Sequence, residues 1–183
     1  MLDKIFGSSK SSLVPSKLLE GIINQSRSEI FFSEFGVPDT VIGRFDMLSL
    51  HTYLLSRRIR KENDQGLFAP LNQDVFDLYV EDIERALRQI GIGDTSVPKR
   101  KKRMVRSFFG LVDDFDRILD GGDSSEFLIR VKNRFIPDSD VEPDLLGQYI
   151  NATEAWLEGQ SASSILAGSL AWNNPDYTQR IIK

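Results

Sequence analysis

Few side chains in this sequence are suited to covalent or metal chemistry. The chain has no cysteine, which excludes thiolate nucleophiles, disulfides and cysteine-ligated metal centres. His51 is the only histidine, and neither Leu50 nor Thr52 beside it can serve as an acid–base partner. We therefore interpret His51 as a packed, hydrogen-bonded residue, and we expect neither a catalytic centre nor a cofactor. The sequence leaves haem binding open.

Carboxylates are the other candidates for metal ligands, and they fall in two clusters. The clusters are Asp113, Asp114, Asp116 and Asp120, then Asp138, Asp140, Glu142 and Asp144. Most of the first cluster falls on the solvent side of an amphipathic helix. The second lacks the 12-residue calcium-loop pattern with its central glycine and terminal glutamate. It is better explained by the start of a helix, where the helix dipole favours negative charge. We predict no metal site.

A glycine-containing turn precedes the most unusual segment of the chain. Gly91 and Gly93 are not followed by the third glycine of a dinucleotide fingerprint, and no strand precedes them, which excludes that kind of phosphate loop. Gly91 is instead suited to end a helix, because glycine adopts the left-handed conformation without strain. Pro98 is suited to begin the next helix, because it has no N–H to leave unpaired. We predict a structural role for Gly91, Gly93, Asp94 and Pro98.

Positive charge is concentrated directly after this turn. The basic residues are Lys99, Arg100, Lys101, Lys102, Arg103 and Arg106. Cations in the first turn of a helix are unfavourable by a few tenths of a kcal/mol each, and consecutive cations repel one another. A solvated helix face is the alternative, but the cost of the arrangement favours a surface that meets a negatively charged partner. An anionic membrane would contribute about 1 kcal/mol per basic residue, and RNA would give strongly salt-dependent binding. Arg57 and Arg58, with Arg60 and Lys61, extend this surface if their helix packs beside it.

The spacing of apolar residues predicts an all-α fold, with no alternating strand pattern and no internal repeat. The expected helices span about residues 16–35, 40–62, 73–90, 98–120, 125–134, 143–158 and 163–172. The helix at 40–62 has two apolar stripes and is expected to be central. Val41, Ile90 and Met104 are expected to face the core. The last helix is expected to close the core, with a docking face for an apolar client helix as the alternative. We predict one single-domain bundle of about six to seven helices at residues 15–175, with a flexible leader at 1–14 and a C-terminal tail at 176–183.

Composition restricts the partners and the location. The 183 residues carry a formal net charge of −4, so binding to a negative partner must be local, and DNA is not an expected partner. No stretch supplies the roughly 20 mostly apolar residues of a membrane span. The amino terminus lacks a charged lead followed by an apolar core, so we expect no signal peptide. These features predict a cytoplasmic protein or a mature organellar one.

Three blocks of sequence resemble the ubiquinol–cytochrome c chaperone family. The first is Asp39 to His51, containing Gly43-Arg44-Phe45, and the second is Gln73 to Arg88. The third joins Gly91-Ile92-Gly93-Asp94 and Val97-Pro98-Lys99 to Met104 and Phe108-Phe109-Gly110. The resemblance covers about residues 35–120. It departs at Leu111, where the family pattern has an arginine.

The resemblance implies an all-α, non-catalytic assembly chaperone that binds newly made cytochrome b and supports assembly of complex III. It implies a bacterial-type member that works peripherally at the inner face of the inner membrane. A small co-chaperone, the ribosome and the anionic membrane surface are the other implied partners, and the oligomeric state stays open. It transfers no catalytic residue. We place partner or membrane contact at Arg44 and at the basic helix 98–106. The alternative is a ribosome- or RNA-binding module that uses this basic helix.

Overall fold

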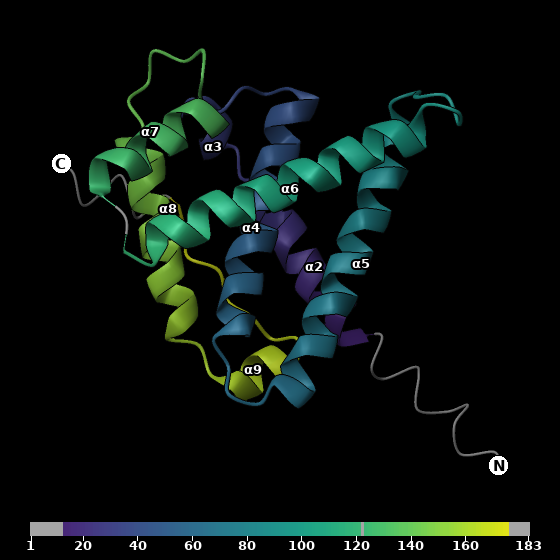
Figure 1. Cartoon of the computed structure of the whole chain (residues 1–183), viewed down its shortest axis with the longest axis vertical. Coiled ribbons are helices and arrows are strands. Elements are labelled where there is room, and N and C mark those ends of the chain that lie inside the picture. The colour runs from purple at the N-terminus through teal and green to yellow at the C-terminus, as the bar shows by residue number, and fades with distance from the viewer. Residues whose placement is uncertain (1–12, 122, 176–183) are drawn as a thin grey trace.

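Helix α4 (Val41–Arg60) is the element on which most of the others pack. The computed structural model describes residues 13–121 and 123–175. Within these residues α4 contacts α2, α5, α6, α7 and α8, and most of its side chains are buried. Figure 1 shows α4 in the middle of the molecule, with α6 crossing in front of it. The central position predicted from its two apolar stripes is confirmed.

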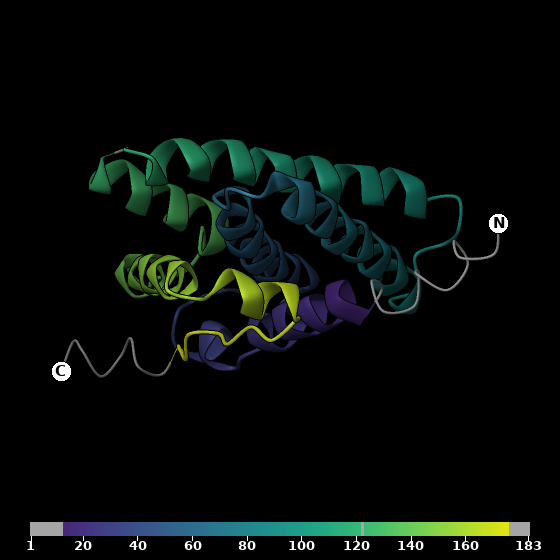
Figure 2. The same ribbon diagram turned by 90° about the horizontal axis from the view of Figure 1, so that it is seen from below.

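The other elements are also helices. They are α2 (Leu13–Ser26), α3 (Ile30–Ser33), α5 (Gln65–Gln89), α6 (Val97–Leu119), α7 (Ser124–Phe135), α8 (Asp144–Glu158) and α9 (Ala162–Leu166). No strand occurs in the described part of the chain, and the predicted all-α fold is confirmed. Viewed from below, α6 forms one outer face, α2 and α3 lie on the opposite face, and α4 and α5 lie between them (Figure 2). Residues 1–12 of the predicted leader and all of the predicted tail lie outside the described residues.

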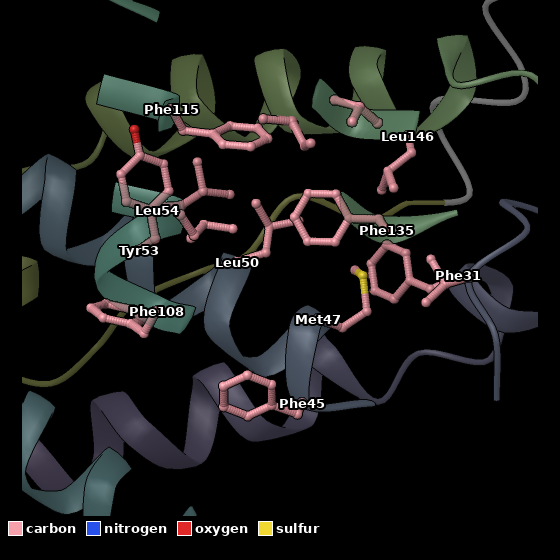
Figure 3. Close-up of a cluster of buried hydrophobic side chains, with 14 of the residues drawn as sticks. Phe31, Phe45, Met47, Leu50, Tyr53, Leu54, Phe108, Phe115, Phe135 and Leu146 are labelled. Carbon is pink, nitrogen blue, oxygen red and sulfur yellow. The ribbon is translucent and has the colours of Figure 1, made fainter. Parts of the chain in front are cut away.

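Two groups of buried side chains hold these helices together. The larger group joins α4 to every other helix from α2 to α8, and Figure 3 shows Met47, Leu50 and Leu54 of α4 among its aromatic side chains. The smaller group, which includes Leu55, Phe68 and Ile165, joins the second half of α4 to α2, the start of α5 and α9. Because α4 contributes to both groups, the position of its first turns is fixed by the rest of the fold.

Three helix boundaries differ from the sequence prediction. The helix expected at 16–35 is broken after Ser26, whose hydroxyl donates to the Ile23 carbonyl, and the chain turns before α3. The turn allows Phe31 to reach the core. Helix α5 begins at Gln65 and includes Pro70, which the sequence prediction placed in a loop. Pro70 is past the first turn, so the helix lacks one backbone hydrogen bond at this residue. The last helix ends at Leu166, and Trp172 packs against His51 from an irregular segment, so this part of the chain closes the core.

His51 is held in a buried network, as expected from the sequence. Its Nδ1 lies 2.7 Å from the Met47 carbonyl oxygen, which can only accept, so Nδ1 carries the proton and Nε2 accepts from the Tyr149 hydroxyl at 2.7 Å. Gln25 donates to the same hydroxyl at 2.9 Å. Burial lowers the pKa of His51 from 6.5 to about 4, against the opposing effect of its Met47 hydrogen bond. The imidazole is therefore neutral, and it ties α2, α4 and α8 together.

This burial makes stability depend on pH. Between pH 6.5 and 4 the unfolded chain binds a proton at His51 that the folded protein excludes. The contribution of His51 to the free energy of unfolding therefore falls by about 3 kcal/mol as the pH drops. Asp46 opposes this trend, because burial, partly offset by Arg134, raises its pKa from 3.8 to about 6. The test therefore compares two proteins. In urea unfolding, the free energy of unfolding of wild type should fall by about 3 kcal/mol more than that of His51→Gln between pH 6.5 and 4. Parallel pH curves would contradict the prediction.

Gly43 is required by a close backbone approach at the start of α4. Thr40 caps this helix by accepting from the Gly43 N–H at 3.1 Å, and a β-carbon at Gly43 would lie 2.0 Å from the Pro38 carbonyl oxygen. We expect Gly43→Ala to lower the free energy of unfolding by about 2 kcal/mol, because the capped turn cannot move without losing its packing.

The matched control is Gly110→Ala in α6, where nothing lies within 4 Å of an added β-carbon. This change should raise the free energy of unfolding by about 0.5–1 kcal/mol, since alanine is the better helix former. Urea unfolding of both variants tests the pair. Equal effects would mean that the Pro38 segment yields to the added methyl group.

Candidate interaction surface

The first half of α6 presents its cations away from the core. Met104, Phe108 and Leu111 define the side of the helix that packs inward. The cations on the other sides are Lys99, Arg100, Lys102, Arg103 and Arg106, which we call the basic face. All five are exposed, and none forms an ion pair with any side chain in the described part of the protein. Together with Ser96 they line a shallow open hollow of about 530 Å³.

Lys101 does not belong to this face. It points toward α5 and lies 2.5 Å from Glu84, which also pairs with Arg88 at 3.0 Å. Arg88 in turn pairs with Asp94 in the turn that joins α5 to α6. These contacts hold α6 against the end of α5, and they give Lys101 a structural partner.

The predicted turn before α6 has the expected geometry. Gly91 has a φ of +82°, and two backbone bonds close the end of α5, from Gly91 N–H to the Arg88 carbonyl and from Ile92 N–H to the Leu87 carbonyl. The Gly93 carbonyl accepts from the N–H groups that begin α6, and Pro98 lies in the first turn of that helix. The turn therefore sets the angle at which α6 leaves α5.

Arg57 and Arg58 are not part of the basic face. Arg57 is only 6% exposed and donates to Asp116 of α6, to Asp120 directly after α6 and to Glu154 of α8. Arg58 donates to the carbonyls of Leu157 and Gln160. Both arginines belong to the end of α4, whereas the basic face belongs to the start of α6. The extension of the surface that the sequence suggested for them is therefore not formed.

An apolar groove lies next to the basic face, and the sequence did not predict it. Val41 and Ile90, expected in the core, are 49% and 51% exposed, and Ile42 is 55% exposed. They border two adjoining hollows of about 330 and 310 Å³ whose shared walls are Val41, Phe45, Leu87, Ile90 and Met104. We call the two hollows together the α4–α5–α6 groove.

The groove exists because apolar residues of α4, α5 and α6 meet where no further helix of the described residues covers them. Val41 and Ile42 begin α4, Ile90 follows the last residue of α5, and Met104 lies in the basic half of α6. A helical periodicity places such residues on the inner side of their own helix but does not show whether a neighbour extends far enough to cover them. The sequence carries no local signal for the exposure of Val41 and Ile42, because successive residues are buried elsewhere in the same helix.

Arg44 lies at one end of this groove. It pairs with Asp39 at 2.6 Å and its guanidinium lies over the Phe32 ring, 5.0 Å from the centroid. Its side chain remains half exposed. Of the predicted contact residues, the structure therefore brings Arg44, Arg100 and Arg103 to one groove.

This arrangement is suited to binding. A profile of the ubiquinol-cytochrome c chaperones matches residues 33–172, which include the groove and the basic face. The chain belongs to the ubiquinol-cytochrome c chaperone family. It is also similar to the crystal structure of the Cbp3 homolog from Brucella abortus, with 32% identity over 92% of this chain and 93% of that one and a TM-score of 0.80. No curated protein matches the chain significantly.

Three further features concern what this member of the chaperone family could bind or cross. In the described residues, no three histidine or acidic side chains are placed to hold a metal ion. No helix among residues 13–121 and 123–175 has both the length and the apolar character needed to cross a bilayer. His51, the only histidine, is enclosed by Met47, Tyr149 and Trp172.

Proposed function

We propose that this protein is a non-catalytic assembly chaperone that binds newly made cytochrome b and supports assembly of ubiquinol–cytochrome c reductase, complex III. The observation that carries the proposal is membership of the ubiquinol-cytochrome c chaperone family over residues 33–172. The uncovered apolar groove within that span supports a role in binding, because exposed apolar surface of this kind marks interaction sites. The proposed role needs no chemical turnover.

The proposal includes a place of action. The protein works peripherally at the cytoplasmic face of the inner membrane, where the basic face meets anionic lipid. Five exposed cations with no ion pair in the described part of the chain support this placement, because an anionic surface attracts clusters of lysine and arginine.

The direct test combines crosslinking with deletion of the gene. The protein, crosslinked in its native membranes, is isolated at low and at high salt, and the bound proteins are identified by mass spectrometry. We expect cytochrome b, with a small co-chaperone as a further partner, and crosslinks from Lys99 or Lys102. Deletion of the gene should lower both cytochrome b and assembled complex III. Unchanged levels of both would contradict the proposal.

The same experiment separates a second candidate function. The basic face also favours a ribosome- or RNA-binding module, because phosphates attract such a cluster and the attraction is steeply salt-dependent. Recovery of only ribosomal proteins and RNA, lost at high salt, with normal cytochrome b levels after deletion, would favour that module.

A further inference from the structure

The α4–α5–α6 groove differs at its two ends, and the difference indicates what it holds. Its middle is apolar, formed by the walls that the two hollows share, Phe45, Leu87 and Met104 among them. One hollow continues to Ile23 on α2, to Arg27 directly after that helix and to Arg44 on α4. The other continues to Arg100 and Arg103 on α6 and to Arg134 on α7. The groove therefore has arginines at both ends of an apolar centre.

Some of these arginines have no acidic partner among residues 13–121 and 123–175. The two acids in the groove are already paired, Asp82 with Arg85 and Asp46 with Arg134. Arg27, Arg100 and Arg103 are exposed, and no ion pair within the described residues involves them. Each end of the groove thus offers at least one cation to a bound carboxylate.

We infer that this groove binds a helical segment of a partner protein that has apolar side chains in its middle and carboxylates near both ends. Amphipathic helices dock in apolar grooves through side chains spaced three or four residues apart, and two adjoining hollows suit two such anchors. Carboxylates at the two ends of the segment would meet Arg27 at one end and Arg100 and Arg103 at the other.

Other occupants fit the charges less well. A phospholipid carries its negative charge at one end only, so it leaves the arginines at the other end without a partner. The cytoplasmic loops of membrane proteins are rich in lysine and arginine and would be repelled by both ends. The inference rests on the proposed function in treating the groove as the binding site of a chaperone, but its test needs no cytochrome b.

The test begins with a peptide selection on the full-length protein. A displayed library of helices of about 15 residues, roughly four turns, is selected for binding to the wild type. We expect the selected peptides to share apolar residues at helical spacing in the middle and aspartate or glutamate near both ends. Their affinities are then measured by fluorescence anisotropy.

Two exposed isoleucines supply a matched pair of variants. Ile42 borders the groove and is 55% exposed, whereas Ile129 lies on α7 outside the groove and is 57% exposed. Ile42→Asp should weaken peptide binding by about tenfold or more, because it puts a charge on the apolar wall. Ile129→Asp should leave binding unchanged.

Charge exchange tests the two ends separately. Arg27→Glu and Arg103→Glu should each weaken a peptide with two acidic ends. Two further peptides each have the acids of one end changed to lysine. One of these peptides should regain affinity for Arg27→Glu, and the peptide changed at its opposite end should regain affinity for Arg103→Glu. This reciprocal rescue would fix the direction of the bound segment, and a purely structural role of the arginines would not produce it.

Several outcomes would overturn the inference. The first is that the selected peptides have basic ends or no charge. The second is that a peptide binds wild type and Ile42→Asp equally well. The third is that no peptide binding depends on Ile42, while binding to anionic vesicles or self-association of the protein does. Each can occur whether or not deletion of the gene lowers cytochrome b, so failure of this inference is distinct from failure of the proposed function.

Discussion

Replacing Arg57 with alanine is expected to lower the free energy of unfolding by about 4 kcal/mol. Its guanidinium lies 2.6 to 3.1 Å from the carboxylates of Asp116, Asp120 and Glu154, and it is nearly enclosed by α4, α6 and α8. The Tyr53 hydroxyl also donates to Asp116, at 3.0 Å. Without the cation, half-buried carboxylates face one another with only part of their charge compensated.

Arg60 is the control for this prediction. It pairs with the same Asp116 at 2.7 Å, but its side chain is much more exposed. Arg60→Ala should therefore cost less than about 1 kcal/mol, as exposed ion pairs usually do. Urea unfolding of both variants at neutral pH gives the comparison. If Arg57→Ala instead keeps wild-type stability and loses partner binding, Arg57 belongs to the interaction surface after all.

The end of α4 shows what the sequence could establish and what it could not. A run of arginine and lysine at the end of a helix complements the helix dipole, and the same run suits an exposed basic patch. Only the positions of α6 and α8 decide between these two interpretations, because the acids that Arg57 meets lie 59 to 97 residues away along the chain. Long-range pairing of this kind has no local signal.

The same limit explains the other differences. The apolar spacing predicted the helices and the central place of α4, because helical periodicity is a local property. The break after Ser26 has no glycine or proline to mark it and is decided by where Phe31 packs. The groove depends on how far neighbouring helices extend past Val41 and Ile90, which composition does not record.

The charges of α6 oppose its helix dipole at both ends, because cations lie near its amino end and carboxylates near its carboxyl end. The two groups differ in how far they form ion pairs with the rest of the protein. The acidic second half carries Asp116, and Asp120 follows directly after the helix. Arg57 and Arg60 of α4 pair with these two carboxylates. The basic first half has one internal ion pair among the described residues, from Lys101 to Glu84. The chain as a whole has a net charge of −4, so this half forms a positive end on a negative molecule. Such asymmetry would turn the basic face toward an anionic surface.

The basic face gives the prediction with the largest expected effect on binding. The double variant Lys102→Glu/Arg106→Glu should bind anionic vesicles about a thousandfold more weakly than wild type at low salt. Each basic residue contributes about 1 kcal/mol at such a surface, and each new glutamate opposes it by a similar amount, for a total of about 4 kcal/mol. Neither residue lines the α4–α5–α6 groove, so the peptide binding described above should not change. Vesicle sedimentation across a salt series measures the effect, which should shrink as salt screens the charges.

Stability of the same variant distinguishes a binding role from a structural one. Lys102 and Arg106 repel each other and their neighbours Lys99 and Arg103, whereas glutamates at these two positions would lie three residues from Lys99 and from Arg103 and attract them. The double variant should therefore unfold at slightly higher urea than wild type while binding is lost. Lys17→Glu, at an exposed lysine on α2 without an ion pair in the described residues, should leave both properties unchanged. Loss of ribosomal RNA binding with vesicle binding intact would instead place the basic face on the ribosome.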